Sequence, residues 1–198
     1  MLSLLAPLKQ GLCFILSAPA GTGKTTLVNL LMKEFPNVIA SISFTTRSPR
    51  MGEINGKDYH FITEQEFNEK IAASDFLEYV KLYGNYYGSS RQWINEQRNQ
   101  GKHVFLVIDT QGAIQLKGKF ESTSIFVSPP SIEVLANRLG NRKTETSEMI
   151  EKRLDWARKE MEFRDAYDYQ LINDDLSNAY QILRSIVIAE THRVKRDK

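Results

Sequence analysis

Apolar residues in this chain occur in short continuous runs that alternate with segments of helical spacing. Strands that alternate with helices are typical of an α/β fold with a mostly parallel sheet. The runs typical of buried strands cover residues 11–17, 38–43, 103–109, 124–127 and 169–172. The segments predicted as helices include one from residue 24 to the proline at 36, one over 90–99, a charged one ending near 163 and one over 176–190.

Residues 45–90 interrupt this alternation with a polar, turn-rich stretch. Within it, Thr63 and Glu66 have the spacing of a capping box that begins a helix. Residues 76–82 alternate like a short strand, and residues 84–90 have the composition of a tyrosine-bearing turn. We therefore expect a small insertion that lies off the main sheet.

The composition is that of an ordinary globular domain. A length of 198 residues with 41% apolar and 25% charged residues is compatible with a single domain and a sizeable core. The net charge of +2 gives no reason to expect a nucleic-acid partner. No apolar run approaches membrane-spanning length, and the single cysteine, Cys13, suits a reducing compartment. We expect a cytoplasmic protein without a membrane partner, either a monomer or a small homo-oligomer.

A loop of small residues joins the first predicted strand to the first predicted helix. Strand, loop and helix in this order form the context of a phosphate-binding P-loop. Gly21 and Gly23 would let backbone N–H groups turn inward, and the helix start adds further donors and a positive dipole end. Lys24 would reach the β- and γ-phosphates, and the Thr25 hydroxyl would ligate Mg²⁺. The residues expected to hold the nucleotide are Ala18, Pro19, Ala20, Gly21, Thr22, Gly23, Lys24, Thr25 and Thr26.

The alternative for this loop is a glycine-containing turn with a surface lysine. Ala18 stands where the usual P-loop pattern begins with glycine, and such a change is mild at a strand end if φ is negative.

Asp109 ends the strand predicted over residues 103–109. An acid at the carboxyl end of a buried parallel strand is placed to bind ligands, and here it would hold Mg²⁺ or its water shell. The alternative is that Asp109 serves as the N-cap of a helix beginning at Gln111.

Three arginines accompany the charged segment after residue 131. Arg138 and Arg142 lie four residues apart and would share a helical face, and Arg153 follows in the long charged helix. Such arginines can neutralise the oxygens of a phosphoryl group in transfer. A solvated helix whose arginines pair with neighbouring glutamates explains the same spacing equally well.

A second cluster lies in the turn-rich insertion. Arg47 and Arg50, together with Tyr59 and Tyr87, could grip a second phosphate. Glu78 could accept hydrogen bonds from the N1–H and N2–H₂ donors of guanine. The alternative for this stretch alone is a solvated loop with surface charge.

The insertion closely resembles the guanylate kinase family. Residues 45–62 fill every position of the family motif T-T-R-x-x-R-x-x-E-x-x-G-x-x-Y-x-F-I. Alanine in place of the first P-loop glycine also occurs in that family. The resemblance extends over nearly the whole chain, to residues 18–25, Glu78, 84–89, Asp109, Gln111, Gly112, 129–131, Arg138, Arg142 and 173–175.

The resemblance implies the reaction of ATP and GMP to ADP and GDP, with dGMP as a further acceptor. It implies a three-layer α/β P-loop fold with a mostly parallel sheet, a helical lid and a small mixed-β insertion. The core would comprise about residues 1–42, 91–135 and 165–198, the GMP-binding region about 43–90 and the lid about 136–164.

The resemblance also implies a role for each matching residue. Ser43, Glu78 and Ser89 would contact guanine. The GMP phosphate would be held by Arg47, Arg50, Tyr59 and Tyr87. Charge on the transferring phosphoryl would be neutralised by Lys24, Arg138, Arg142 and Arg153. Asn173 would lie near adenine, and Asp109 would sit between Mg²⁺ and GMP.

Val107 departs from the family pattern, because many relatives carry an acid at this position. The departure predicts weaker binding of guanine or metal, or compensation by another group. A lost hydrogen bond to a charged group would weaken binding by roughly ten- to a hundredfold.

Three other functions fit parts of the sequence. A kinase of the same fold for another phosphorylated acceptor should lack the guanine contacts. A non-catalytic protein-binding module typically loses the loop lysine or the lid arginines, which this chain retains. A P-loop GTPase would need an Asn-Lys-x-Asp motif, which is absent from the sequence.

Overall fold

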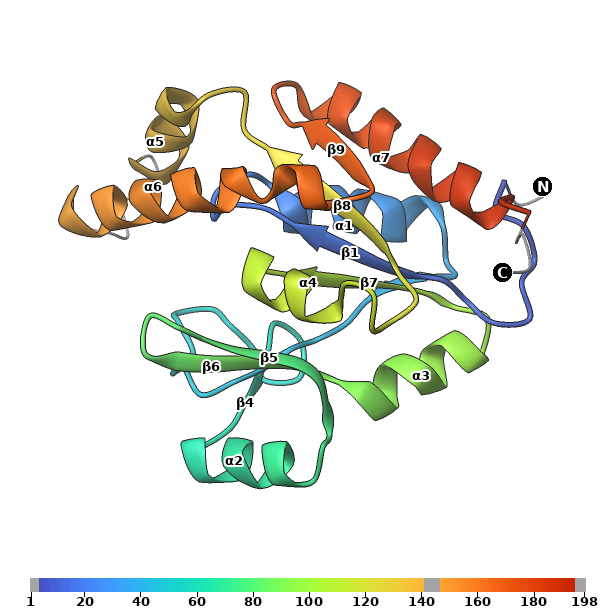
Figure 1. The fold of residues 1–198 in the computed structure, drawn as a ribbon, viewed down its shortest axis with the longest axis horizontal. Coiled ribbons are helices and arrows are strands. Elements are labelled where there is room, and N and C mark those ends of the chain that lie inside the picture. Colours follow the sequence, from blue (N-terminus) through green and yellow to red (C-terminus); the bar gives the residue numbers. More distant parts are fainter. Residues whose placement is uncertain (1–3, 141–146, 195–198) are drawn as a thin grey trace.

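A sheet of five parallel strands forms the centre of the computed structural model, which describes residues 4–140 and 147–194. Its strand order is β2-β7-β1-β8-β9, and every neighbouring pair is parallel (Figure 1). The predicted α/β fold with a mostly parallel sheet is thereby confirmed. The strands are β1 Cys13–Ser17, β2 Val38–Ala40, β7 His103–Ile108, β8 Thr123–Ser128 and β9 Tyr169–Ile172.

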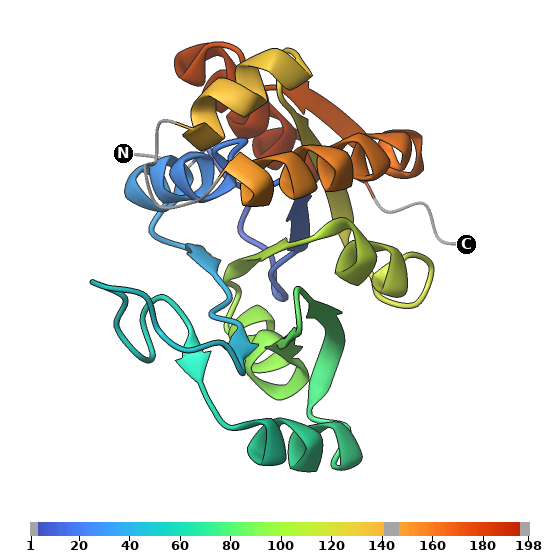
Figure 2. The ribbon, with the colours of Figure 1, turned by 90° about the vertical axis from the view of Figure 1, so that its left-hand side faces the viewer.

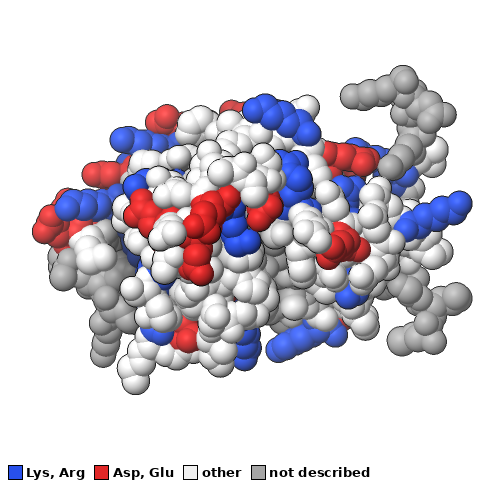
Figure 3. Space-filling view, turned by 90° about the horizontal axis from the view of Figure 1, so that it is seen from below, with Lys and Arg blue, Asp and Glu red and all other residues white. Residues whose placement is uncertain are grey.

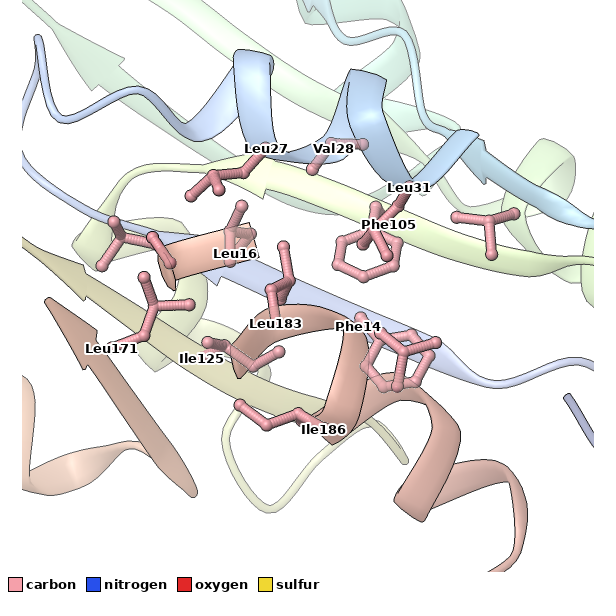
Figure 4. Packing of buried hydrophobic residues seen from close by; sticks show 14 of the residues in the cluster. Phe14, Leu16, Leu27, Val28, Leu31, Phe105, Ile125, Leu171, Leu183 and Ile186 are labelled. Atoms are coloured by element: carbon pink, nitrogen blue, oxygen red, sulfur yellow. The ribbon is translucent and has the colours of Figure 1, made fainter. Parts of the chain in front are cut away.

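Helices cover both faces of this sheet, because its strands are apolar on both sides. Helices α1 (Lys24–Glu34) and α7 (Leu176–Thr191) pack on one face, and α3 (Arg91–Asn99) and α4 (Thr110–Leu116) pack on the other. The side chains of β1 alternate between the two layers. Phe14, for example, belongs to the cluster with α1 and α7 shown in Figure 4. The result is a three-layer core.

The insertion folds as a separate mixed sheet below the main one in Figure 1, with helix α2 (Glu64–Ala72) farthest from it, as the side view of Figure 2 also shows. The capping box of Thr63 and Glu66 is formed as predicted. The strand order is β4-β3-β6-β5, in which β3 and β4 are parallel and the other pairs antiparallel. The strands are β3 Phe44–Thr45, β4 His60–Phe61, β5 Phe76–Leu82 and β6 Asn85–Ser90.

The prediction of a turn over residues 84–90 was wrong. Residues 85–90 form strand β6, which pairs with β3 on one side and β5 on the other. The turn is confined to Tyr83 and Gly84, whose φ angles are +50° and +83°. Two residues with positive φ suit a tight hairpin between right-twisted strands. The strand predicted over 38–43 is also shorter and ends at Ala40.

Helices α5 (Ile132–Gly140) and α6 (Ser147–Glu162) form a third small cluster. Leu135 and Leu139 of α5 pack with Ala157 of α6. The short 3₁₀ helix η1 (Arg164–Ala166) follows and leads into β9. These two helices fall in the segment that we expect to act as a lid, and the predicted Arg142 between them lies outside the described residues.

The charges on the surface are mixed in sign. On the face seen from below, basic and acidic side chains of the described residues are interspersed (Figure 3). None of the helices in the described ranges has the length and apolar character needed to cross a membrane.

An aromatic core holds the insertion together. Phe67 of α2 is fully buried and stacks on Phe76 and Tyr86, with ring centroids 4.4 Å and 5.2 Å away. We expect Phe67→Ala to lower the free energy of unfolding by about 3–5 kcal/mol, because it leaves a cavity that the sheet cannot fill. Chemical denaturation measures this loss.

Met51→Ala is the control for Phe67→Ala, because Met51 is fully exposed on a loop of the same insertion. Its effect should stay within about 0.5 kcal/mol. A loss below about 1 kcal/mol for Phe67→Ala would contradict this account of the insertion's stability.

Candidate active site

A single cavity of about 260 Å³ lies where the main sheet, the insertion and α6 meet. Residue Ser17 at the end of β1 pairs with Ile108 at the end of β7, so the P-loop and Asp109 begin side by side. Of the predicted donor-side residues, the cavity is lined by Ala18, Ala20, Lys24, Asp109 and Arg153. Of the predicted acceptor-side residues, it is lined by Ser43, Arg47, Arg50, Tyr59, Glu78 and Tyr87.

The P-loop has the backbone conformation that its glycines predict. Gly21 and Gly23 both have φ of +90°, a left-handed conformation that disfavours other residues. The Asn173 side chain donates to the Thr22 carbonyl over 2.7 Å. A Cβ added at Gly23 would lie 2.6 Å from Asn173 Nδ2. Asn173 therefore holds the P-loop through its contacts with Thr22 and Gly23, a role that the sequence did not suggest.

Lys24 is the first residue of α1, and its side chain turns back over the loop. Its Nζ donates to the carbonyls of Ala18 over 2.6 Å and Pro19 over 3.3 Å. The N-cap of α1 is Gly23, so the residue at this position has no side chain with which to cap the helix. Thr25 and Thr26 follow on the exposed side of the same turn. The N-terminus of α1 and the Lys24 ammonium group thus both lie at this loop, and both features favour anion binding.

Asp109 has the capping role that the sequence offered as an alternative, and one of its oxygens is left over. Its Oδ1 accepts from Gly112 N over 3.0 Å and so caps α4, which begins at Thr110. Within the described part of the chain, its buried Oδ2 has no hydrogen-bond partner. Burial raises the pKa of Asp109, while Lys24 acts in the opposite direction. The second oxygen is therefore available to a ligand from the cavity.

Glu53 holds the two arginines of the predicted phosphate site in place. The Glu53 carboxylate accepts from both Nη atoms of Arg47, over 2.8 Å and 2.9 Å, and from Arg50 N over 2.7 Å. The Arg47 guanidinium lies over the Tyr59 ring, 5.3 Å from its centroid, and Tyr59 contacts the Tyr87 ring edge-on. Bidentate pairing holds the guanidinium in a fixed orientation. Glu53 belongs to the recognised motif, yet its positioning role emerges only from the structure.

Glu78 and Ser89 form a buried pair at the acceptor end of the cavity. Glu78 is 4% exposed, and Ser89, directly opposite it on β6, donates to Glu78 Oε1 over 2.6 Å. Burial raises the pKa of Glu78 to about 7, and the nearby Asp109 adds to the rise. A carboxylate held this way can accept hydrogen bonds from a planar N–H edge.

Helix α6 contributes an acid that sequence reasoning missed. Glu160 is 5% exposed, lines the cavity and accepts from the Thr110 hydroxyl over 3.3 Å. Burial raises its pKa, and Lys24 opposes that rise. The sequence does contain a signal for it. Ile150, Leu154, Ala157 and Glu160 follow one another at helical spacing, so an acid occupies the apolar face of the helix.

An aromatic contact joins the insertion to α6 across the cavity. The ring of Tyr83, at the tip of the β5–β6 hairpin, lies 6.3 Å from that of Trp156. Both residues line the cavity, and neither was predicted as part of the site. This contact brings the acceptor and donor halves of the site together.

Two further residues singled out from the sequence differ in their relation to the cavity. Arg138 on α5 donates to the Asp174 carbonyl over 3.4 Å and is not among the lining residues. Val107, the departure from the family pattern, does line the cavity. No group of three or more acidic, histidine or cysteine side chains suited to a metal occurs among the residues the structure describes.

Comparisons with known proteins agree with this geometry. The model of the family described as guanylate kinase matches residues 10–190. The guanylate kinase of Protochlamydia amoebophila is 66% identical over 188 residues, which cover 95% of each chain. That of Chlamydia muridarum is 47% identical over 182 residues, covering 91% of this chain and 89% of the relative.

A solved structure extends the likeness to the fold. The crystal structure of guanylate kinase from Anaplasma phagocytophilum superimposes with a TM-score of 0.78 at 32% identity. The match covers 93% of this chain and 88% of that one. The chain therefore belongs to the guanylate kinase family.

Proposed function

We propose that this protein transfers the γ-phosphoryl group of ATP to GMP, and also to dGMP. The observation that carries the proposal is that one cavity joins two kinds of residue. The P-loop lysine, Lys24, lies on one side, and Arg47 and the buried Glu78 lie on the other. A binding module or a hydrolase would need only one of these halves.

Recognition of the acceptor rests on the insertion. The Glu78 carboxylate accepts from guanine N1–H and N2–H₂, while Ser43 and Ser89 add contacts to the base. Arg47, held by Glu53, and Arg50 neutralise the GMP phosphate. Tyr59 and Tyr87 complete that phosphate site. Adenine lacks the N1–H and N2–H₂ donors that face Glu78, so AMP would leave the buried carboxylate without the hydrogen bonds that guanine supplies beyond that of Ser89.

Phosphoryl transfer proceeds directly from ATP to GMP. The GMP phosphate is already anionic near neutral pH, so no general base is needed, and catalysis comes from positioning and charge stabilisation. Lys24, Arg138, Arg142 and Arg153 neutralise the transferring group. The contact between Tyr83 and Trp156 supports the roles of residues 43–90 and 136–164 as segments that close over the substrates and exclude water.

The donor set of the site also fits Mg²⁺. Asp109 directs a buried carboxylate oxygen that is unpartnered within the described ranges, and Thr25 offers a hydroxyl on the P-loop helix. Mg²⁺ is usually held by one or two carboxylates together with phosphates and water, so a larger acidic cluster is not required. When bound, the ion would neutralise negative charge on the phosphates.

Glu160 can compensate for the acid that many relatives carry at the position of Val107. It places a second carboxylate on the cavity wall beside Asp109, from a different element. We assign to Glu160 the support of the ion or of Lys24 that an acid at position 107 would give.

The cellular setting follows from the same proposal. A GMP kinase serves purine nucleotide metabolism, and the buried reduced thiol of Cys13 suits the cytoplasm.

The choice of acceptor tests the proposed function most directly. With ATP as donor, the rate of ADP release should be at least about 10²-fold higher with GMP than with AMP, CMP or UMP, because only guanine pairs with Glu78. A coupled assay with each nucleotide measures this preference. Equal rates for AMP and GMP would contradict the role of Glu78.

The donor side is tested through the P-loop lysine. Lys24→Ala should lower kcat by about 10²- to 10³-fold, because a charge next to the transferring phosphoryl is lost. Lys33→Ala is the matched control, since Lys33 is exposed in the last turn of the same helix. Circular dichroism should show both variants folded. Normal turnover of Lys24→Ala would refute the phosphate role.

The pKa of Glu78 predicts the pH dependence of GMP use. Guanine pairs with the ionised carboxylate, whose pKa is raised to about 7 in the free protein. The value of kcat/KM for GMP should therefore rise between about pH 6 and about pH 8, above the ionisation of GMP itself near about 6. In Glu78→Gln the step near neutral pH should vanish. An identical profile for both proteins would assign that step to another group.

A further inference from the structure

Helix α4 lies very close to strand β5, which carries Glu78, and a side chain on the facing residue of α4 would not fit between them. The Gln115 side-chain amide donates to the Tyr79 carbonyl over 2.9 Å and accepts from Tyr79 N over 3.4 Å. Gln115 thereby fixes α4 against the backbone of the residue that follows Glu78. Gly112 lies one turn earlier on the same helical face.

Gly112 occupies the point of closest approach. A Cβ added there would lie 2.6 Å from Glu78 Oε2 and 3.3 Å from Asp109 Oδ1. The first distance is too short for a non-bonded contact, so a side chain at this position would push the Glu78 carboxylate aside. The same Gly112 also donates its N–H to Asp109 Oδ1.

Backbone conformation does not explain this glycine. Gly112 has helical dihedral angles and is absent from the residues with positive φ in the described chain. Within a helix, glycine costs about 1 kcal/mol relative to alanine. Its advantage must come from the space that it leaves.

We propose that Gly112 is a positioning residue for guanine specificity. It leaves the space that Glu78 Oε2 occupies, while Ser89 holds Oε1 from the opposite side. The carboxylate is thus fixed between a hydroxyl and a bare helix backbone, with its accepting edge toward the cavity. The inference rests on the proposed function, because it concerns how the GMP site is shaped.

The test is Gly112→Ala in the full-length protein. Alanine should keep or raise stability, because it favours the helix and displaces only the end of a side chain. The KM for GMP should rise about tenfold or more, with KM for ATP nearly unchanged, and the preference for GMP over AMP should fall by a similar factor. Gly140→Ala is the matched control, since Gly140 is also helical and, among the residues that the structure describes, no non-local atom lies within 4 Å of its added Cβ.

A double-mutant cycle separates this role from a general structural one. In Glu78→Asp the carboxylate is one methylene shorter and withdraws from α4, so adding Gly112→Ala should have little further effect on KM for GMP. A full additional loss in the double variant would overturn the proposal, as would a Gly112→Ala protein with normal KM for GMP. Absence of GMP turnover in the unmodified protein would instead overturn the proposed function, together with the inference that depends on it.

Discussion

The cavity must bind two polyanions beside buried carboxylates, and this electrostatic constraint determines most of the site. Glu78, Asp109 and Glu160 all line the same space, and burial raises the pKa of each. Such a group of acids is costly unless cations or N–H donors face it. Lys24 supplies one cation in the free protein, and its charge opposes the pKa rise of both Asp109 and Glu160. Substrate phosphates would then compete with these acids for Lys24.

In the fold, each of these charged residues comes from a different element. The parallel register of β1 and β7 places the P-loop beside Asp109, at the carboxyl ends of adjacent strands. The insertion brings Glu78 to the same point from a second sheet, and α6 brings Glu160 from a third cluster. The three carboxylates therefore meet only because the main sheet, the insertion and α6 pack around one cavity.

The sequence predicts the frame of this arrangement better than its fine structure. The long apolar runs identified the main strands because burial on both faces leaves no polar alternation. Residues 85–90 were mistaken for a turn because their tyrosines, glycine and serines resemble turn residues, while the pairing partners lie elsewhere in the chain. The P-loop and Asp109 follow from local pattern. Glu160 is marked in the sequence only as an acid on the apolar face of a helix, and its role, like that of Trp156, depends on where α6 packs rather than on any motif.

In the proposed site, guanine specificity depends on residues that are unfavourable in their own helix or strand but give the site its geometry. Gly112 weakens the helix in which it lies, and Glu78 is an acid at a buried strand position. Each residue is unfavourable alone, but together they leave the Glu78 carboxylate at a fixed position on the cavity wall. In the proposed site, a wrong base would donate no hydrogen bond to the buried Glu78, and this penalty would add to the attraction that is lost with guanine. On the proposed assignment, rejection of the wrong acceptor would therefore rest on the packing of α4 against β5, away from the P-loop.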